Sequence, residues 1–276
     1  MLSKRERLFS AIEQLNGLIC PTCRKPLDRQ GDSLICESGH LLNVNRRGCL
    51  NLLSARVDTF YDAALFASRQ RVFDAGCYRS VADLLRTMLP DHPARILDAG
   101  CGEGWYLNDL LTTRPDCIGA GIDISRDAIL LAANHPCSAV WCVADLRRVP
   151  FADGTFDIVL DVLTPANYQE FQRVLKPEGT FIKVYPGEDY LREIRAVRGL
   201  PAYADGQVDA YLHEKATVLK TCHVHEAVTV TPSLWRDFVY MTPLNQDLSD
   251  AEKEQLASMP RECITIDLHI AQCRLQ

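Results

Sequence analysis

The 276-residue sequence lacks a long hydrophobic run. Its longest apolar stretch is the six residues from Ala128 to Ala133, whereas a membrane-spanning helix needs about 20. The first 17 residues mix both charge signs and lack the apolar core of a signal peptide. We therefore expect a cytoplasmic protein with no membrane partner, in a compartment where thiols stay reduced.

The composition also lacks the bias of a disordered or collagen-like chain, since 47% of residues are hydrophobic and 24% are charged. Twelve cysteines in a reducing compartment suggest metal ligands and buried thiols, not a disulfide framework. A strong positive charge is missing too, because the net charge is −6. Residues 1–60 nevertheless carry a net +3. This basic head permits contact with RNA, but chance asymmetry explains it equally well.

The chain divides into four segments by pattern. Residues 1–17 predict a helical extension, 18–55 a loop-rich module, 56–70 a linker and 71–276 one large domain. In the last segment strands alternate with helices, which predicts a parallel sheet covered on both faces. The expected strands are Ala94–Ala99, Cys117–Asp123, Ala139–Ala144, Phe156–Leu163 and Thr180–Tyr185, with a terminal pair at Ala227–Thr231 and Cys263–Cys273.

The small module contains a metal-binding pattern. Cys20, Cys23, Cys36 and His40 have the spacing C-x2-C-x12-C-x3-H, two ligand pairs that suit tetrahedral zinc with a β-hairpin between them. A module of this size is too small for a self-sufficient core, so the metal would supply its folding energy. Because three thiolates and one imidazole fill the coordination shell, we expect a structural zinc ion.

A glycine-rich turn follows the first strand of the large domain. Asp98, Gly100, Gly102 and Gly104 form the pattern D-x-G-x-G-x-G. The sixth position counted from Gly100 is Trp105, which disfavours the dinucleotide fingerprint, and the Lys-Ser/Thr of a Walker A loop is absent. The pattern is instead that of class I methyltransferases, in which the bare backbone lies against S-adenosylmethionine.

Acidic residues follow the next two strands. Asp123 ends the second strand, 19 residues after Gly104, where a carboxylate can accept both ribose hydroxyls. Asp145 follows the third strand, beside the expected adenine. Asp145 is also explained as a loop cap, and Asp157 as a turn residue. Asp161 ends the fourth strand, near the expected methyl group.

These motifs together resemble the bacterial 23S ribosomal RNA guanine-N1 methyltransferases, a zinc-binding family that includes macrolide-resistance members. The resemblance runs from Cys20 to the C-terminal strand. It includes Gly48–Leu53, similar to G-x-x-N-L-L, and Arg71–Tyr78, similar to R-x-F-L-D-A-G-x-Y. Met241-Thr242-Pro243 is similar to a late M-T-P segment.

The resemblance implies a class I methyltransferase fold, Rossmann-like with a mostly parallel seven-stranded sheet, and a small N-terminal zinc-binding β module. The chain departs from the family pattern at Tyr61, Asp161 and Tyr190. The expected cofactor contacts are Tyr78, Asp98, Gly100, Cys101, Gly102, Asp123, Asp145, Leu146 and Tyr190.

The implied reaction is methylation of guanine N1 in a 23S rRNA hairpin, and the resemblance also implies a homodimer. Asp161, Thr164, Pro165 and Tyr185 are candidates to line the target pocket, and no general base is assigned. Two alternatives are a small-molecule methyltransferase with a structural zinc module and a non-catalytic homologue that retains cofactor binding. The basic side chains expected to contact RNA are Arg24, Lys25, Arg29, Arg46 and Arg47, with Arg147 and Arg148 beside the cofactor loop.

Overall fold

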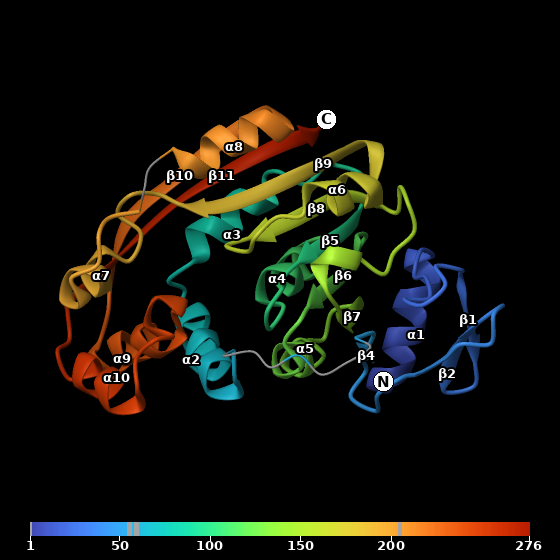
Figure 1. Ribbon diagram of the computed structural model, residues 1–276, viewed down its shortest axis with the longest axis horizontal. Helices are drawn as coiled ribbons and strands as arrows, with labels where there is room; N and C mark the ends of the chain where they lie inside the picture. The colour runs from blue at the N-terminus through green and yellow to red at the C-terminus, as the bar shows by residue number, and fades with distance from the viewer. Residues whose placement is uncertain (1, 54–56, 58–60, 204–205) are drawn as a thin grey trace.

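The computed structural model describes residues 2–53, 57, 61–203 and 206–276. An eight-stranded sheet runs through the molecule, with strand order β10-β11-β9-β8-β5-β6-β7-β4 (Figure 1). From β4 to β9 neighbouring strands are parallel, and β11 is antiparallel to both of its neighbours. The strands are β4 Leu50–Asn51, β5 Arg95–Ala99, β6 Ile118–Asp123, β7 Ala139–Val143, β8 Phe156–Val162, β9 Leu175–Pro186, β10 Ala216–Thr229 and β11 Cys263–Leu275.

This sheet confirms the predicted class I methyltransferase fold, with seven strands from β5 to β11. The two-residue strand β4 is an addition that the sequence did not predict. It pairs Leu50 with Cys142 and Asn51 with Val143 of β7. The segment after the zinc module therefore joins the edge of the main sheet, and the module is tied to the large domain by backbone hydrogen bonds.

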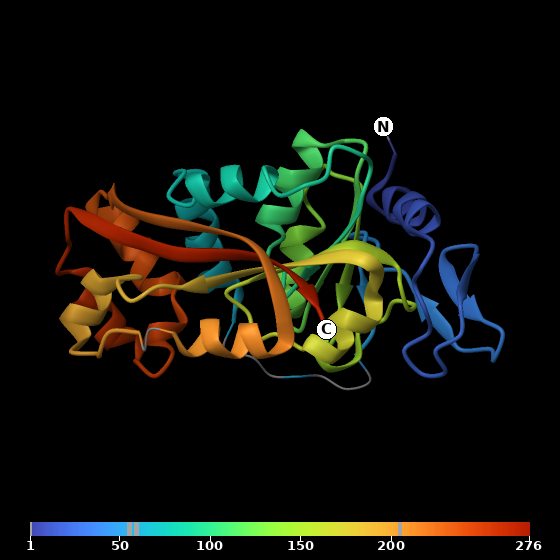
Figure 2. The same ribbon diagram turned by 90° about the horizontal axis from the view of Figure 1, so that it is seen from above.

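Helices cover both faces of the sheet, as the alternating pattern predicted. One face packs against α1 (Lys4–Leu15), α6 (Tyr168–Val174) and α8 (Gln207–Lys215). The other packs against α3 (Arg79–Arg86), α4 (Trp105–Thr113) and α5 (Arg126–Ala132). Figure 2 shows the sheet between these layers. The remaining helices are α2 Ala63–Asp74, α7 Arg192–Arg198, α9 Pro232–Met241 and α10 Asp250–Ala257.

The N-terminal module is a separate small sheet of β1 (Leu27–Gln30), β2 (Ser33–Cys36) and β3 (Leu41–Asn43). The antiparallel β1–β2 hairpin lies between the two ligand pairs, as predicted. Backbone bonds attach the module to the loop between β7 and β8: Ile19 N–H donates to Pro150 O (3.0 Å), and Ala152 N–H donates to Gly17 O (2.8 Å). The module therefore packs against the segment that leads from β7 into β8.

The segment expected as a linker, 56–70, lies partly outside the described residues. Its second half is helical, because α2 begins at Ala63 with Asp62 as its N-cap. The Asp62 carboxylate accepts a hydrogen bond from Leu65 N–H at 2.8 Å. An Asp at this position satisfies an amide that has no partner within the first helical turn.

Candidate functional site

The glycine turn connects β5 to α4 at the carboxyl edge of the sheet. Gly100, Gly102 and Gly104 all have positive φ, at 76°, 54° and 75°. A Cβ at Gly100 would lie 2.5 Å from the Thr164 side chain, and a Cβ at Gly104 would lie 2.5 Å from Trp141. The backbone conformation and the neighbouring side chains therefore both require glycine, which leaves a bare backbone surface that fits a closely bound cofactor.

Asp123 lies at the end of β6, next to this turn. Its Oδ2 accepts a hydrogen bond from Gly102 N–H (2.9 Å) and its Oδ1 accepts one from Ser125 N–H (2.8 Å). Each carboxylate oxygen has two lone pairs, so Asp123 can still accept two ribose hydroxyls. Asp123 therefore lies next to the glycine turn, as expected from the sequence.

Asp98 is the buried acid of the turn. It is 2% exposed, and no residue that the structure describes donates a hydrogen bond to its carboxylate. Burial, together with the charges of Asp123 and Asp161, raises its pKa to about 8. An unpartnered buried carboxyl group next to the turn fits a ligand that brings its own hydrogen-bond donor, as the amino group of S-adenosylmethionine does.

Asp145 and Leu146 begin a short helical turn after β7. Asp145 Oδ1 accepts from Arg147 N–H (2.8 Å), and its Oδ2 accepts from the Arg147 guanidinium (2.7 Å). The hydrogen bonds to Arg147 oppose the cost of burial and lower the Asp145 pKa. Asp145 thus caps the loop, the alternative left open from the sequence, and an acid that caps a loop is still available to a cofactor beside it.

Tyr78 and Tyr190, 112 residues apart, lie in contact. Their hydroxyl oxygens are 2.7 Å apart, and both side chains are buried. Tyr190 is one of the positions at which the chain departs from the family pattern, and its hydroxyl places a polar group there. The structure therefore joins two of the residues expected to contact the cofactor.

Arg69 and Glu103 form an ion pair over the glycine turn, which the sequence did not reveal. Arg69 Nη2 lies 2.7 Å from Glu103 Oε2, and the Glu103 side chain is 3% exposed. A Cβ at Gly102 would collide with the Arg69 guanidinium. No motif marks Arg69, because its partner lies 34 residues away and depends on how α2 packs.

Asp161 pairs with Lys183 on the neighbouring strand β9. Lys183 Nζ lies 2.7 Å from Asp161 Oδ1, and the two side chains are 8% and 0% exposed. Lys183 also donates to the carbonyl oxygen of Thr164. Burial raises the Asp161 pKa to about 6, against the opposing effect of Lys183. The pair therefore holds the turn that follows β8, and Lys183 is a second site residue that the sequence did not identify.

The other pocket candidates lie along the same edge. The Thr164 hydroxyl is 3.4 Å from the Gly100 carbonyl oxygen, so the turn after β8 contacts the glycine turn. Pro165, next to it, is exposed. Tyr185 ends β9, donates to Asp209 Oδ1 (2.9 Å) and stacks on His269. Cys101 is buried within the glycine turn.

The four expected metal ligands converge in the N-terminal module. The Sγ atoms of Cys20 and Cys36 lie 3.6 and 3.3 Å from His40 Nδ1, and the Sγ atoms of Cys23 and Cys36 are 3.5 Å apart. Ligand atoms of a tetrahedral zinc site with these donors are about 3.5–3.8 Å apart. A hydrogen bond from the Lys25 backbone lowers the Cys23 pKa to about 6, which favours the thiolate that zinc binds. The set fits one structural zinc ion.

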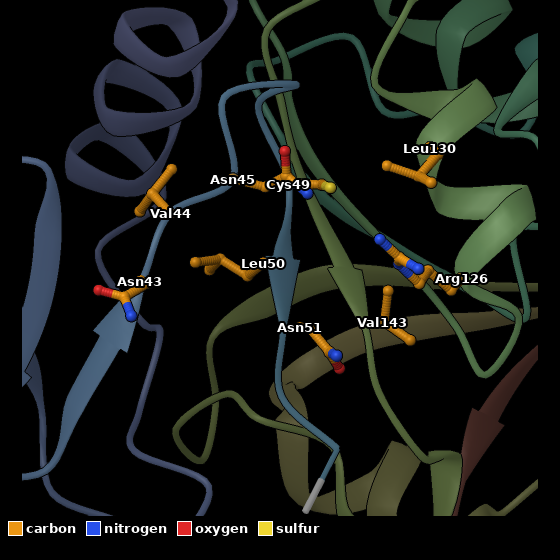
Figure 3. A pocket seen from close by; sticks show the side chains of 9 residues that line it. All are labelled: Asn43, Val44, Asn45, Cys49, Leu50, Asn51, Arg126, Leu130 and Val143. Atoms are coloured by element: carbon orange, nitrogen blue, oxygen red, sulfur yellow. The ribbon is translucent and has the colours of Figure 1, made fainter. Parts of the chain in front are cut away.

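A cavity of about 220 Å³ separates the module from α5 (Figure 3). Its lining comes from β3, β4, β7 and α5 and includes Asn43, Asn45, Asn51 and Arg126. Neither the glycine turn nor Asp123 lines it. The cavity is therefore distinct from the cofactor cradle, by which we mean the surface formed by the glycine turn, Asp98 and Asp123.

Most of the basic side chains expected to contact RNA already have partners. Arg29 pairs with Glu6 and Lys25 with Glu37. The Arg24 guanidinium donates to Val149 O at 3.2 Å. Arg147 pairs with Asp145, and Arg148 donates to Thr22 O at 3.4 Å. Arg46 and Arg47 are exposed, and their guanidinium groups contact no acidic side chain that the structure describes.

Two family models match the chain. Residues 18–57 match the zinc ribbon described as RlmA, N-terminal, and residues 96–179 match a family described as a methyltransferase domain. Together they cover the metal ligands and the segment from the glycine turn to the start of β9. The chain is therefore an S-adenosylmethionine-dependent methyltransferase with a zinc ribbon.

Two curated proteins are similar over much of their length. YxjB of Bacillus subtilis (strain 168), provisionally named a 23S rRNA (guanine-N(1)-)-methyltransferase, is 36% identical over 91% of this chain and 94% of its own. The 23S rRNA (guanine(748)-N(1))-methyltransferase of Streptomyces fradiae is 33% identical over 66% and 68%. A chain in the complex of the Haloferax volcanii Trm112 methyltransferase activator with a methyltransferase shares the fold. It has a TM-score of 0.50, 17% identity, and coverage of 79% of this chain and 98% of that one.

Proposed function

Because the chain belongs to the 23S rRNA (guanine-N1) methyltransferase family, we propose that it methylates N1 of a guanine in a 23S rRNA hairpin. The observation that carries the proposal is the joining of a cofactor cradle and a zinc ribbon at one edge of the sheet. The ribbon is attached at Pro150 and Ala152, a few residues beyond Asp145 in the cofactor loop. We infer that the ribbon, bound to this segment, holds a macromolecular substrate next to the cradle.

When bound, S-adenosylmethionine supplies the activated methyl group. The residues of this chain then have to place the target base in line with it. Guanine N1 carries a proton at neutral pH, and a base within a hairpin must leave its stack to reach the pocket. Thr164 and Pro165 form the wall next to Gly100. They are the groups placed to contact a flipped base.

Asp161 and Lys183 hold the turn at Thr164 in place from inside the protein. Both are buried, so neither touches the base in the described conformation. Lys183 holds the Thr164 carbonyl oxygen, and Asp161 holds Lys183. We assign both as positioning residues for the turn at Thr164. A water molecule, and not the buried Asp161, would then receive the N1 proton.

The zinc ribbon is proposed to bind the RNA backbone through Arg46 and Arg47. Both are exposed and lie in the turn between β3 and β4. Unpaired cations are more available to phosphates than Arg29 or Lys25, whose charges are already neutralised. A homodimer would present two such ribbons to one hairpin. A cytoplasmic location is consistent with a ribosomal RNA substrate.

A small-molecule methyltransferase is the alternative that most needs to be separated from this proposal. The acidic domain after residue 60, with a net charge of −9, favours it. In that case the ribbon would only cover the cradle, and its exposed arginines would not affect turnover. RNA binding through these arginines would instead weaken with salt, because bound phosphates release counterions.

The experiment compares wild type with Arg46→Ala/Arg47→Ala and with Arg261→Ala, an exposed arginine control at the start of β11. Binding to 23S rRNA fragments and transfer of labelled methyl are measured over a salt series. We expect the slope of log RNA affinity against log salt concentration to be less steep by about two in the double variant. The cofactor affinity should stay unchanged. Equal RNA affinity and transfer in all three proteins would contradict the proposed role of the ribbon.

A further inference from the structure

A cluster of histidines lies on the long antiparallel strand pair β10–β11, which Figure 1 shows at the end of the sheet opposite the ribbon. His223 pairs with His269, and His225 pairs with Asp267, in the antiparallel register. Paired residues, and residues two apart on one strand, share a face of the sheet. A His-Val-His segment on β10 therefore faces an Asp-Leu-His segment on β11, with all four polar side chains on one side.

Three of these side chains converge on a common point. His223 Nε2 lies 2.6 Å from Asp267 Oδ1, and the rings of His223 and His269 are stacked at 4.2 Å with 10° between their planes. One ligand atom from each of His223, Asp267 and His269 lies within 4.8 Å of the other two. The Asp267 side chain is 5% exposed and that of His223 is 47% exposed. A buried carboxylate thus lies beneath imidazoles that solvent can reach.

The carboxylate is held in place by a second layer of contacts. Asp189 N–H donates to Asp267 Oδ2 at 2.8 Å, and His225 Nε2 lies 3.1 Å from Asp189 Oδ2. The ring of His269 also stacks on Tyr185, with centroids 5.4 Å apart. Such outer contacts orient ligands in metal sites. Among the residues that the structure describes, none forms a hydrogen bond with the His269 ring.

We propose that His223, Asp267 and His269 bind one divalent first-row transition-metal ion of the Zn²⁺ class, with a fourth position open to water. Two imidazoles and one carboxylate are ligands that zinc accepts, whereas Mg²⁺ and Ca²⁺ prefer oxygen alone. Tetrahedral ligands of this kind are about 3.4 Å apart. The ligand atoms now lie within 4.8 Å of one another, and rotation of the two imidazole rings brings them to this separation. On binding, the metal takes the place of the hydrogen between His223 Nε2 and Asp267, and the ring binds as the neutral tautomer that carries its proton on Nδ1.

The site differs chemically from the ribbon because it has no thiolate, and it does not depend on the proposed function. Metal content per chain is measured by mass spectrometry after incubation with Zn²⁺ and buffer exchange. We expect two Zn²⁺ in wild type and one in His223→Ala/His269→Phe, in which phenylalanine keeps the stack on Tyr185. His92→Ala, an exposed histidine outside the cluster, should retain two.

Cobalt provides a second readout that separates the two sites. Co²⁺ in the ribbon gives an intense thiolate-to-metal charge-transfer band, whereas Co²⁺ at the histidine cluster adds only weak ligand-field bands. We expect those weak bands to disappear in the double variant while the thiolate band stays, which also shows that the variant is folded. One Zn²⁺ in wild type, or two in both wild type and the double variant, would overturn the proposal.

Discussion

The buried pair of Asp161 and Lys183 allows a quantitative test of how the site is built. Lys183→Met removes the ammonium next to a carboxylate that is 0% exposed. The other oxygen of that carboxylate, Oδ2, already has no hydrogen-bond partner. Breaking a buried ion pair by removing one partner costs about 3–5 kcal/mol, whereas replacing both partners is often nearly neutral. We therefore expect Lys183→Met to lower the free energy of unfolding by about 3–5 kcal/mol.

A closely matched control lies on the same two strands. Lys176 Nζ is also 2.7 Å from a carboxylate, that of Asp157, but the Lys176 side chain is 40% exposed. Exposed pairs contribute about 0–1 kcal/mol, so Lys176→Met should change the free energy of unfolding by no more than that. The distance and the chemical groups are the same, so the two pairs differ in burial and in the additional bond from Lys183 to the Thr164 carbonyl oxygen.

The assay is urea unfolding of wild type, both single variants of the buried pair and the double variant Asp161→Asn/Lys183→Met. We expect a coupling energy of about 1–3 kcal/mol, with the double variant more stable than the sum of the single effects predicts. The turnover number should fall in the double variant, because the Thr164 carbonyl oxygen loses its anchor. A loss in Lys183→Met no larger than in Lys176→Met would refute the reasoning.

Three further perturbations test the cradle and the ribbon. Gly102→Ala, at φ 54° and against Arg69, should abolish S-adenosylmethionine binding measured by calorimetry. Gly154→Ala, at φ 63° in open space, should retain that binding. Equal binding by the two variants would contradict the assignment of the cradle. Burial raises the Asp98 pKa to about 8, so the native state holds a proton that the unfolded chain loses near pH 4. The free energy of unfolding should therefore fall as the pH rises from about 4 to about 8. Asp98→Asn should flatten this dependence in urea unfolding without cofactor; an unchanged slope would argue against a protonated Asp98. Zinc binding contributes about 10–16 kcal/mol in such modules. Removing the zinc with a chelator should therefore raise the rate of amide exchange in residues 18–53 but not in β5–β9. Protection that persists in the ribbon would count against a structural ion.

Local patterns predicted the parts of the fold that rest on local chemistry. The ligand spacing of Cys20 to His40 and the glycines after β5 are fixed by coordination and by positive φ, so sequence order alone reveals them. The buried strands β5 to β9 are continuous apolar runs, and they were predicted within a few residues at most boundaries. The expected start of β9 at Thr180 was five residues late, because Lys176–Gly179 carries the polar signature of a turn.

The parts that the sequence did not reveal depend on tertiary pairing. The Arg69–Glu103 pair and the partnership of Lys183 with Asp161 arise from helix packing and strand register, which no short motif encodes. Strand β10 begins at Ala216, 11 residues before the predicted start, because most of its side chains are exposed and give little apolar alternation. Helices α8 to α10 were missed for a related reason: α8 and α10 bury few residues each.

The measurement that tests the central claim most directly is nucleoside analysis of 23S rRNA after reaction with labelled S-adenosylmethionine. Unmodified 23S rRNA is incubated with the zinc-loaded protein, digested to nucleosides and separated. The account predicts that the label is found in 1-methylguanosine, with the Gly102→Ala variant giving none. Cofactor binding without labelled RNA, or label in a different nucleoside, would contradict it.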